Sequence, residues 1–333
     1  MQLNNLYKPI KKDLFEMEQL LRMSILSSKN KSILNVGSYL LDRPGKRLRP
    51  ALVILCAKAT SRRSSQTIKR QVTKIASGIE LIHIASLIHD DVIDHASLRH
   101  SRPSVNYQWG QDVSVALGDY LYSKASELIS SCGNMDVLSC ISQATALMCE
   151  GELIQVCERD NLDLLRERYL IIVKNKTASL FAASCQSGAL LSNCQRPTQI
   201  AFKQFGFNFG IAFQIADDCL DLISRTKDLG KSPGADFRMG EVTLPILNLL
   251  SQSKDKLRII SLVRGKGTER AFGELRQMFL DSDALLKTKR DILFFIEAAK
   301  GSLRSLKNSC FKESLISLAE HIIHNLPERG SYA

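Results

Sequence analysis

The sequence of 333 residues is poor in residues that interrupt helices, with only 8 prolines and 18 glycines. No clean alternation of apolar and polar residues is long enough to predict a strand of useful length. Tryptophan occurs once, and neither a zinc-finger spacing nor an aromatic RNA-binding pattern is present. These absences argue against an all-β fold and against nucleic acid as a partner.

Long apolar runs are also missing. No uninterrupted run reaches the roughly 18 residues that a membrane-spanning helix needs, and the first 21 residues mix charges throughout, unlike a signal peptide. None of the nine cysteines forms a CxxC pair, and an odd, scattered set is typical of thiols in a reducing compartment. We therefore expect a cytoplasmic protein.

Helical periodicity accounts for most of what the chain does contain. Hydrophobic residues make up 44% of it, and they recur at the spacing of an amphipathic helix over long segments. These segments predict helices at residues 14–27, 33–41, 50–58, 75–89, 113–130, 135–157, 166–191, 199–223, 244–250, 269–280, 285–308 and 313–324. No internal repeat interrupts this pattern, so we expect a single all-α domain over residues 1–333.

Two acidic clusters stand out, because each lies in an otherwise apolar stretch. They are Asp90, Asp91 and Asp94 in LIHDDVIDH, and Asp217, Asp218 and Asp221 in GIAFQIADDCLDL. Residues three and four apart share one face of a helix, so each cluster points its carboxylates into one volume. Hard divalent cations such as Mg²⁺ prefer oxygen ligands of this kind. One cluster alone fits a solvated acidic face equally well, whereas the repeat favours two walls of one metal-binding cavity.

The positive charge predicts what accompanies the metal. Lys and Arg exceed Asp and Glu by 45 − 34 = 11, a balance that suits phosphorylated molecules or an anionic membrane surface. Basic residues lie near the acidic clusters at Lys46, Arg47, Arg49, Arg99, Arg102, Lys174, Lys176 and Lys231. Each alone indicates only a solvated face, but together they predict a diphosphate-binding cradle.

At this point the sequence resembles the trans-prenyltransferases, the polyprenyl diphosphate synthase family, and within it the long-chain octaprenyl and heptaprenyl type. The resemblance rests on motifs in order: GKRLRP, IELIHIASLIHDDVIDHASLR, ALGDYL, EGELIQ, KTASLFAASCQSGA, GIAFQIADDCLDL, LGKSPGAD and TLP. It implies an all-α isoprenoid synthase bundle around a deep central cavity. It also implies Mg²⁺-dependent condensation of isopentenyl diphosphate with an allylic diphosphate.

The resemblance carries roles to individual residues. The six aspartates match the metal ligands. The positions that match the isopentenyl diphosphate site are Lys46, Arg49 and His83, and those that match the allylic site are Arg99, Lys176 and Lys231. Thr177 and Gln214 match polar positions near the reacting carbons. The residues expected to be catalytic are Asp90, Asp91, Asp94, Lys176, Asp217 and Asp218.

Two positions depart from the family pattern. His100, which we still expect to bind substrate, stands where a second arginine is frequent, and Glu241 stands where lysine is common. A histidine is largely neutral at pH 7, and the glutamate removes a positive charge. Both changes predict weaker diphosphate binding.

Product length should depend on Ile82, Ala85 and Ser86, which lie one and two helical turns before Asp90. In short-chain relatives, bulky aromatic residues near the first turn form a floor. Ala85 and Ser86 leave this turn open, which predicts an all-trans product of six or more isoprene units, of the kind used for quinone side chains. A short-chain farnesyl or geranylgeranyl diphosphate synthase is the alternative.

The family resemblance and the apolar segment 113–130 also predict a homodimer, with peripheral membrane association through the product. Other classes share part of the pattern. A regulatory subunit of a hetero-oligomeric synthase would be expected to have lost metal-binding aspartates, and a terpene cyclase would not need Lys46, Arg49 and His83. An HD-type phosphohydrolase would use His89-Asp90, but it would leave the second acidic cluster unexplained.

Overall fold

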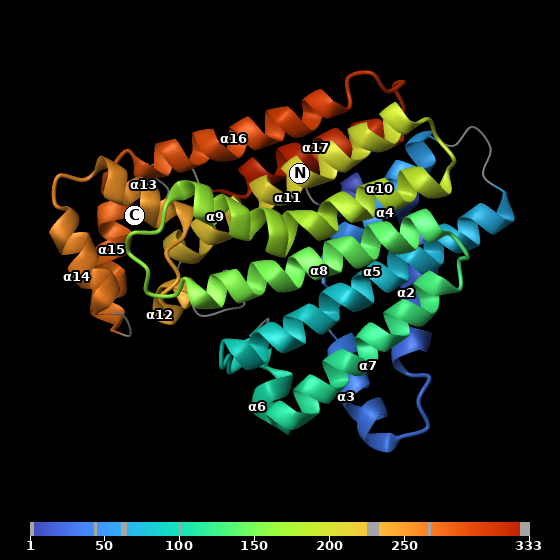
Figure 1. The fold of residues 1–333 in the computed structure, drawn as a ribbon, viewed down its shortest axis with the longest axis horizontal. Helices are drawn as coiled ribbons and strands as arrows, with labels where there is room; N and C mark the ends of the chain where they lie inside the picture. Colours follow the sequence, from blue (N-terminus) through green and yellow to red (C-terminus); the bar gives the residue numbers. More distant parts are fainter. Residues whose placement is uncertain are drawn as a thin grey trace. The chain divides into compact units, whose positions relative to one another are not determined.

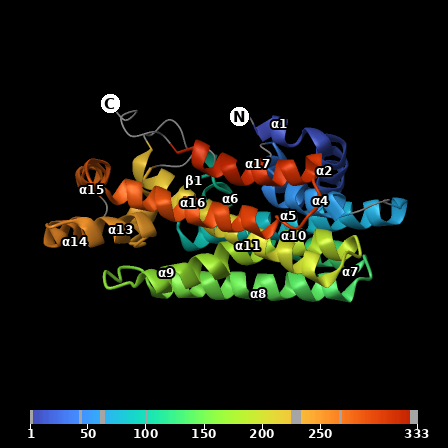
Figure 2. The ribbon, with the colours of Figure 1, turned by 90° about the horizontal axis from the view of Figure 1, so that it is seen from above.

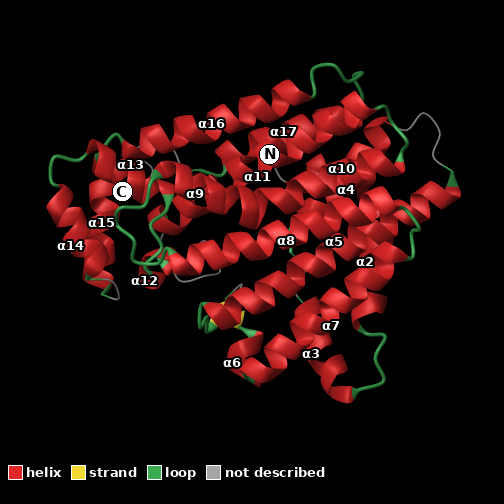
Figure 3. Ribbon diagram, viewed as in Figure 1, coloured by secondary structure: helices red, strands yellow, loops and turns green. Residues whose placement is uncertain are grey.

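The computed structural model describes residues 3–42, 45–60, 65–99, 101–224, 233–265 and 268–326. The predicted all-α class is confirmed, because helices dominate these ranges (Figure 3). The only strands in the described part of the chain are β1 (Leu98–Arg99) and β2 (Arg102–Pro103), which pair antiparallel.

The predicted helices are present, and most of them are longer by a few residues than the periodic core that revealed them. The helix predicted over residues 285–308, however, ends at Ser302. The helices are α2 (Lys11–Ile25), α3 (Lys31–Leu41), α4 (Leu48–Thr60), α5 (Gln66–Ile93), α7 (Gln111–Ser130), α8 (Met135–Cys157), α11 (Arg196–Ile223), α13 (Leu244–Gln252), α15 (Glu269–Asp281), α16 (Ala284–Ser302) and α17 (Cys310–His324). Capping explains part of the added length. The side chain of Ser65, for example, accepts a hydrogen bond from the backbone N–H of Ile68 and begins α5 nine residues before the predicted start.

The predicted helix over residues 166–191 is present without a break, but it is not α-helical throughout. The segment consists of α9 (Arg166–Val173), a π-helix labelled η2 (Lys174–Ala178) and α10 (Ser179–Leu191). Short elements were also missed: α1 (Leu3–Leu6), the 3₁₀-helix η1 (Lys8–Ile10), α6 (Val105–Trp109), α12 (Ala235–Met239) and α14 (Lys256–Arg264). Most of these are too short to show a helical period.

The chain divides into two compact units, which are described separately. The first comprises Met1–Thr145, Leu180–Gly206 and Ser302–Leu318. Its centre is α5, which packs against α2, α4 and α7 (Figure 1). With 28 residues, α5 is about 42 Å long, so one helix reaches from the Ser65 cap to the first acidic cluster.

The second unit comprises Ala146–Ser179, Phe207–Gly301 and Ala319–Ala333. It contains α9 and η2, the acidic end of α11, and the group α13 to α15, whose helices lie together in Figure 2. The sequence boundaries between the units fall within or at the ends of helices, as in α8 between Thr145 and Ala146. The single domain predicted from the sequence stays a prediction.

Among the described residues, α8 is the one helix that is long and apolar enough to cross a membrane by length and composition. Only 28% of its most apolar window is buried. The helix also carries Glu150 and Glu152. Because a single helix of this kind is also found in soluble proteins, it is weak support for a membrane protein.

Candidate active site

The first acidic cluster lies at the carboxyl end of α5, in the first unit. The helix ends at Ile93 and Asp94 is its C-cap, while Asp91 is buried with 4% of its surface exposed. Arg99, on β1, donates hydrogen bonds from Nε (2.9 Å) and Nη2 (2.6 Å) to Oδ1 of Asp91. A predicted metal ligand and a predicted diphosphate ligand therefore bind each other directly.

The charges around Arg99 show that the rest of the cluster is close to it. Burial alone would lower the pKa of Arg99, but Asp91 and then Asp90 and Asp94 raise it above its ordinary value. Arg99 therefore stays fully charged beside this cluster. A charged guanidinium at the edge of an acidic cluster is suited to bind an oxygen of a diphosphate.

His89, next to Asp90 in the sequence, contacts another helix. Its Nε2 lies 3.2 Å from the carbonyl oxygen of Val115 and 3.7 Å from Oδ1 of Asp119, both on α7. A Cβ at Gly118 would come within 2.1 Å of this nitrogen, so the glycine of the ALGDYL motif makes room for the histidine. His89 thus packs α5 against α7, as a structural residue would, which disfavours the phosphohydrolase alternative.

The residues predicted to hold isopentenyl diphosphate lie in the first unit. Arg49 on α4 is buried, its guanidinium lies 4.2 Å from the centre of the Phe181 ring, and its Nε has no hydrogen-bond partner in the described structure. Burial lowers its pKa to about 10, against the effect of Glu80. A buried N–H without a partner costs free energy, and an anion bound there would supply the acceptor. Lys46 is exposed, and His83 is half-buried on α5.

The second acidic cluster lies on α11, in the second unit, where its three aspartates have different surroundings. Asp217 is exposed and Asp218 is buried. The carboxylate oxygens of Asp221 accept hydrogen bonds from the backbone N–H groups of Ala235 and Asp236, each at 3.2 Å. Asp221 thus also stabilises the beginning of α12.

A chain of hydrogen bonds fixes Asp218. Tyr169 on α9 donates from its hydroxyl to Oδ2 (2.6 Å), and Gln214 donates from Nε2 to Oδ1 (2.8 Å). Thr177 of η2 donates to Oε1 of Gln214 at 2.7 Å. Burial raises the pKa of Asp218 to about 7, the two donors oppose this, and Asp217 and Glu241 add to it. A buried carboxylate with a raised pKa is a site where a cation would bind favourably.

The π-helix η2 brings Thr177 to this chain, and it presents Lys176 beside it. The ammonium of Lys176 forms an ion pair with Glu152 on α8. A Cβ at Gly151 would lie 2.3 Å from the backbone nitrogen of Lys176, so only glycine allows α8 and η2 to approach this closely. Within the EGELIQ motif, Gly151 thus lets η2 approach α8, and Glu152 binds the ammonium of Lys176.

Glu241, the departure from the family pattern, is mostly buried and held by two donors. Gln155 donates a hydrogen bond to Oε2, and Nη2 of Arg159 lies 3.4 Å from Oε1. Together with Asp217 and Asp218, Glu241 makes this part of the second unit strongly acidic. The family motifs include Glu152, in EGELIQ, but assign it no role. Tyr169 was missed, because a lone tyrosine in an amphipathic helix carries no signal of its own.

The carboxylate oxygens are the ligand type that Mg²⁺ prefers, so the residues present fit the predicted metal. In the described parts of the chain, no three His, Cys, Asp or Glu side chains lie close enough to hold a metal ion by themselves. Mg²⁺ commonly takes one or two protein carboxylates and completes its coordination with phosphate oxygens and water. His100 and Lys231 lie outside the described residues.

Comparison with known proteins defines the class. Residues 30–278 match the polyprenyl synthetase family model. The chain is 35% identical to heptaprenyl diphosphate synthase component 2 of Geobacillus stearothermophilus over 262 residues (79% of this chain, 80% of the relative). It is 30% identical to octaprenyl diphosphate synthase of Escherichia coli (strain K12) over 296 residues (88% and 90%).

The fold comparison agrees. A polyprenyl synthase from Caulobacter crescentus CB15, solved with calcium and isoprenyl diphosphate, superposes with a TM-score of 0.90 at 31% identity, covering 97% of both chains. The helical architecture is therefore that of an isoprenoid synthase. The chain belongs to the polyprenyl synthetase family, and it is a prenyltransferase.

Proposed function

We propose that the chain condenses isopentenyl diphosphate with an allylic diphosphate and extends it to a long all-trans polyprenyl diphosphate in a Mg²⁺-dependent reaction. The observation that carries the proposal is the pair of buried aspartates, Asp91 and Asp218. Each is the second residue of an Asp-Asp-x-x-Asp sequence, and each is held by donors that fix its carboxylate. The heptaprenyl and octaprenyl products named for the relatives support the long chain.

In this proposal the cationic residues bind the two substrates. Lys46, Arg49 and His83 hold isopentenyl diphosphate, and Arg49 can do so through its unpaired Nε. Arg99, Lys176 and Lys231 bind the allylic diphosphate, and His100 stands at a position that contacts isopentenyl diphosphate in the family. His100 and Lys231 lie outside the described residues. All six aspartates would hold Mg²⁺ ions, which neutralise the negative charge that builds up on the leaving diphosphate.

The side chains then act on the reacting atoms. The allylic C–O bond breaks and its electron pair leaves with the diphosphate, where Arg99 and Lys176 stabilise the charge. The alkene of isopentenyl diphosphate attacks the resulting carbocation, a C–C bond forms, and a proton passes to the released diphosphate. The hydroxyl of Thr177 donates a hydrogen bond to Oε1 of Gln214, so the lone pairs of its oxygen point elsewhere and can stabilise a nearby positive charge.

The test is a condensation assay on the purified chain with isopentenyl diphosphate, an allylic primer and Mg²⁺. Asp90→Ala and Asp217→Ala should each lower turnover by roughly two or more orders of magnitude without a loss of helicity. Asp136→Ala, which alters an exposed aspartate in the first turn of α8, should leave turnover near that of the wild type. Near-normal activity in both acidic-cluster variants would contradict the proposal.

Assembly and location belong to the same proposal. We expect residues 1–333 to act as one domain in a cytoplasmic homodimer, with peripheral membrane contact through the product. On α7, Val113, Val115 and Tyr122 are 39%, 45% and 42% exposed, which supports a subunit contact on this helix. A relative named as component 2 of a heptaprenyl synthase gives a hetero-oligomer as the alternative. The mass of the isolated chain from light scattering at micromolar concentration distinguishes the two.

A further inference from the structure

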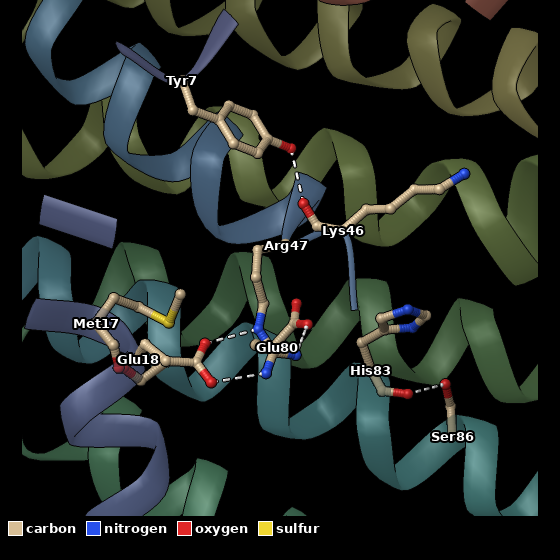
Figure 4. A network of polar contacts seen from close by, with 9 residues as sticks. Tyr7, Met17, Glu18, Lys46, Arg47, Glu80, His83 and Ser86 are labelled. Carbon is tan, nitrogen blue, oxygen red and sulfur yellow. Dashed lines mark hydrogen bonds and ion pairs between the residues drawn. The ribbon is translucent and has the colours of Figure 1, made fainter. Parts of the chain in front are cut away.

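The motif GKRLRP places three basic residues, Lys46, Arg47 and Arg49, within four positions. Counted as charges, all three would bind a diphosphate. The side chain of Arg47, however, points away from the side chain of Lys46 and toward α2 and α5 (Figure 4). It is only 12% exposed, and it lies against two glutamates from distant parts of the first unit (Figure 4).

All three nitrogens of the Arg47 guanidinium donate hydrogen bonds to these carboxylates. The guanidinium donates from Nε (2.8 Å) and Nη2 (3.0 Å) to the two oxygens of Glu18 on α2, and from Nη1 (2.7 Å) to Oε1 of Glu80 on α5. One positive charge thus faces two negative charges. This group as a whole carries a net negative charge, so it would repel a diphosphate rather than attract it.

The backbone at Arg47 also requires support. Its φ of 54° lies in the left-handed region, which costs free energy in a residue that carries a Cβ. Such a conformation persists where the surroundings enforce it. On one side, the hydroxyl of Tyr7 donates to the carbonyl oxygen of Lys46 at 2.9 Å. On the other, the carbonyl oxygen of Arg47 accepts from the N–H of Ala51 at 3.1 Å and begins α4.

These contacts connect the residues proposed to bind isopentenyl diphosphate. Glu80, only 4% exposed in its side chain, lies one turn before His83 on α5. One turn before Glu80, the hydroxyl of Ser77 donates to the carbonyl oxygen of Met17 on α2 at 3.2 Å. Arg47 therefore fixes the segment that carries Lys46 and Arg49 to the helix that carries His83, with α2 as the support.

We propose that Arg47, with Glu18 and Glu80, is a positioning residue for isopentenyl diphosphate. It sets the spacing between His83 on α5 and two residues at the start of α4, which are Lys46, just before the helix, and Arg49, in its first turn. It does not touch the substrate. This inference rests on the proposed function, because it assumes that Lys46, Arg49 and His83 bind isopentenyl diphosphate. A lysine at this position would keep the charge but could not form the two-pronged contact with Glu18.

Removing the negative charge of Glu80 distinguishes a positioning role from a purely electrostatic one, because the two roles predict opposite changes in the affinity for isopentenyl diphosphate. Glu80→Gln removes a negative charge close to the proposed diphosphate site, so simple electrostatics predicts tighter binding of isopentenyl diphosphate. Positioning predicts weaker binding, because Arg47 loses a charged partner. Arg47→Gln should weaken binding in the same direction, and Arg47→Lys should lie between Arg47→Gln and the wild type.

The experiment measures the dissociation constant of isopentenyl diphosphate by titration calorimetry, and the KM of each substrate, for the full-length chain. Arg47→Gln and Glu80→Gln should each raise the dissociation constant by about tenfold to a hundredfold, whereas the KM of the allylic diphosphate should change by less than about twofold. A loss of folding would instead lower kcat and affect both substrates. Arg166→Gln is the matched control, since Arg166 makes a similar two-pronged contact with Asp291 in the second unit. The Arg166→Gln variant should bind isopentenyl diphosphate with the affinity of the wild type.

Two results would overturn the inference while leaving the proposed function intact. The first is a Glu80→Gln variant that binds isopentenyl diphosphate as tightly as the wild type or more tightly. The second is a rise in both KM values by the same factor. If the wild-type chain itself does not bind isopentenyl diphosphate, the proposed function fails, and this inference fails with it. Glu80→Gln keeps the shape of the side chain, so the test does not depend on an unfolded variant.

Discussion

The guanidinium of Arg99 and the carboxylate of Asp91 form an ion pair at 2.6 Å in which the arginine side chain is 20% exposed and the aspartate side chain 5%. Replacing Arg99 with glutamine would leave a buried carboxylate without its charged partner. We expect Arg99→Gln to lower the free energy of unfolding by about 3 kcal/mol, measured by urea denaturation in metal-free buffer.

Two variants check that explanation. Adding Asp91→Asn to Arg99→Gln should recover most of the lost stability, because the uncompensated charge is then gone. Lys124→Gln, which breaks an ion pair with the exposed Glu127 on the same helix, should cost less than about 1 kcal/mol. An Arg99→Gln variant as stable as the wild type would mean that the pair contributes nothing to the fold.

The hydrogen bond from Tyr169 to Asp218 predicts a pH dependence. Burial raises the pKa of Asp218 to about 7, above the 3.8 of a free aspartate, and the Tyr169 hydroxyl acts to lower it. Because the folded-state pKa is the higher one, the contribution of this group to stability is full below about pH 4 and is lost as the pH rises through 7. Tyr169→Phe should raise the pKa further, so the variant should lose more stability than the wild type above pH 7.

Urea denaturation in the presence of a chelator at pH 5.5 and pH 8.5 measures this effect. Tyr169→Phe should be less stable than the wild type by about 2 kcal/mol at pH 8.5 and by clearly less at pH 5.5, where Asp218 is protonated. Tyr39→Phe removes a hydroxyl that donates to the neutral carbonyl oxygen of Pro103, so its effect should be the same at both values. An equal loss at both values for Tyr169→Phe would contradict the assignment.

A glycine pair tests the close approach of α8 to η2. Gly151→Ala would put a methyl group 2.3 Å from the backbone nitrogen of Lys176, and backbone cannot rotate away as a side chain can. We expect a loss of about 1–3 kcal/mol in stability together with a higher KM for the allylic diphosphate. Gly273→Ala, in α15, has no atom within 4 Å of the new Cβ and should stabilise the chain by about 0.5–1 kcal/mol. A neutral Gly151→Ala would show that η2 moves freely.

The sequence was sufficient for features that depend on local periodicity. The apolar stripe along residues 75–89 predicts α5, and the spacing of Asp90, Asp91 and Asp94 places them at one end of it. The family motifs also identified Thr177 and Gln214, which are 37 positions apart and share a hydrogen bond. Local periodicity could not show that these two residues are close in space, and the family motifs supplied this information.

Features that depend on long-range contacts could not be predicted. Arg47 was grouped with Lys46 and Arg49 because all three are basic, yet its partners Glu18 and Glu80 lie 29 and 33 positions away. The π-helix inside residues 166–191 was missed for the same reason. The composition of this segment is helical throughout, and the close contact of η2 with Gly151 on α8 is a long-range one.

The length of the product is set, in our proposal, by the residues before Asp90. Ile82 and Ala85 are each 3% exposed, whereas Ser86 is half-buried and its hydroxyl donates to the carbonyl oxygen of His83 at 2.9 Å. A phenylalanine at Ala85 would have to displace packed neighbours, which commonly costs about 1–3 kcal/mol. Ser86→Phe therefore offers the cleaner test, because its ring can enter the path of the growing chain without first disrupting the core.

We expect the wild-type chain to give products of six or more isoprene units, and Ser86→Phe to give shorter ones, because a ring one turn before Asp90 would act as a floor. Chromatography of the dephosphorylated products measures both lengths. Ser86→Ala removes the hydroxyl without adding volume and should leave the length unchanged. A wild-type product that stops at farnesyl or geranylgeranyl length would show that another element closes the path. An unchanged length in Ser86→Phe would show that the product does not pass this side of α5.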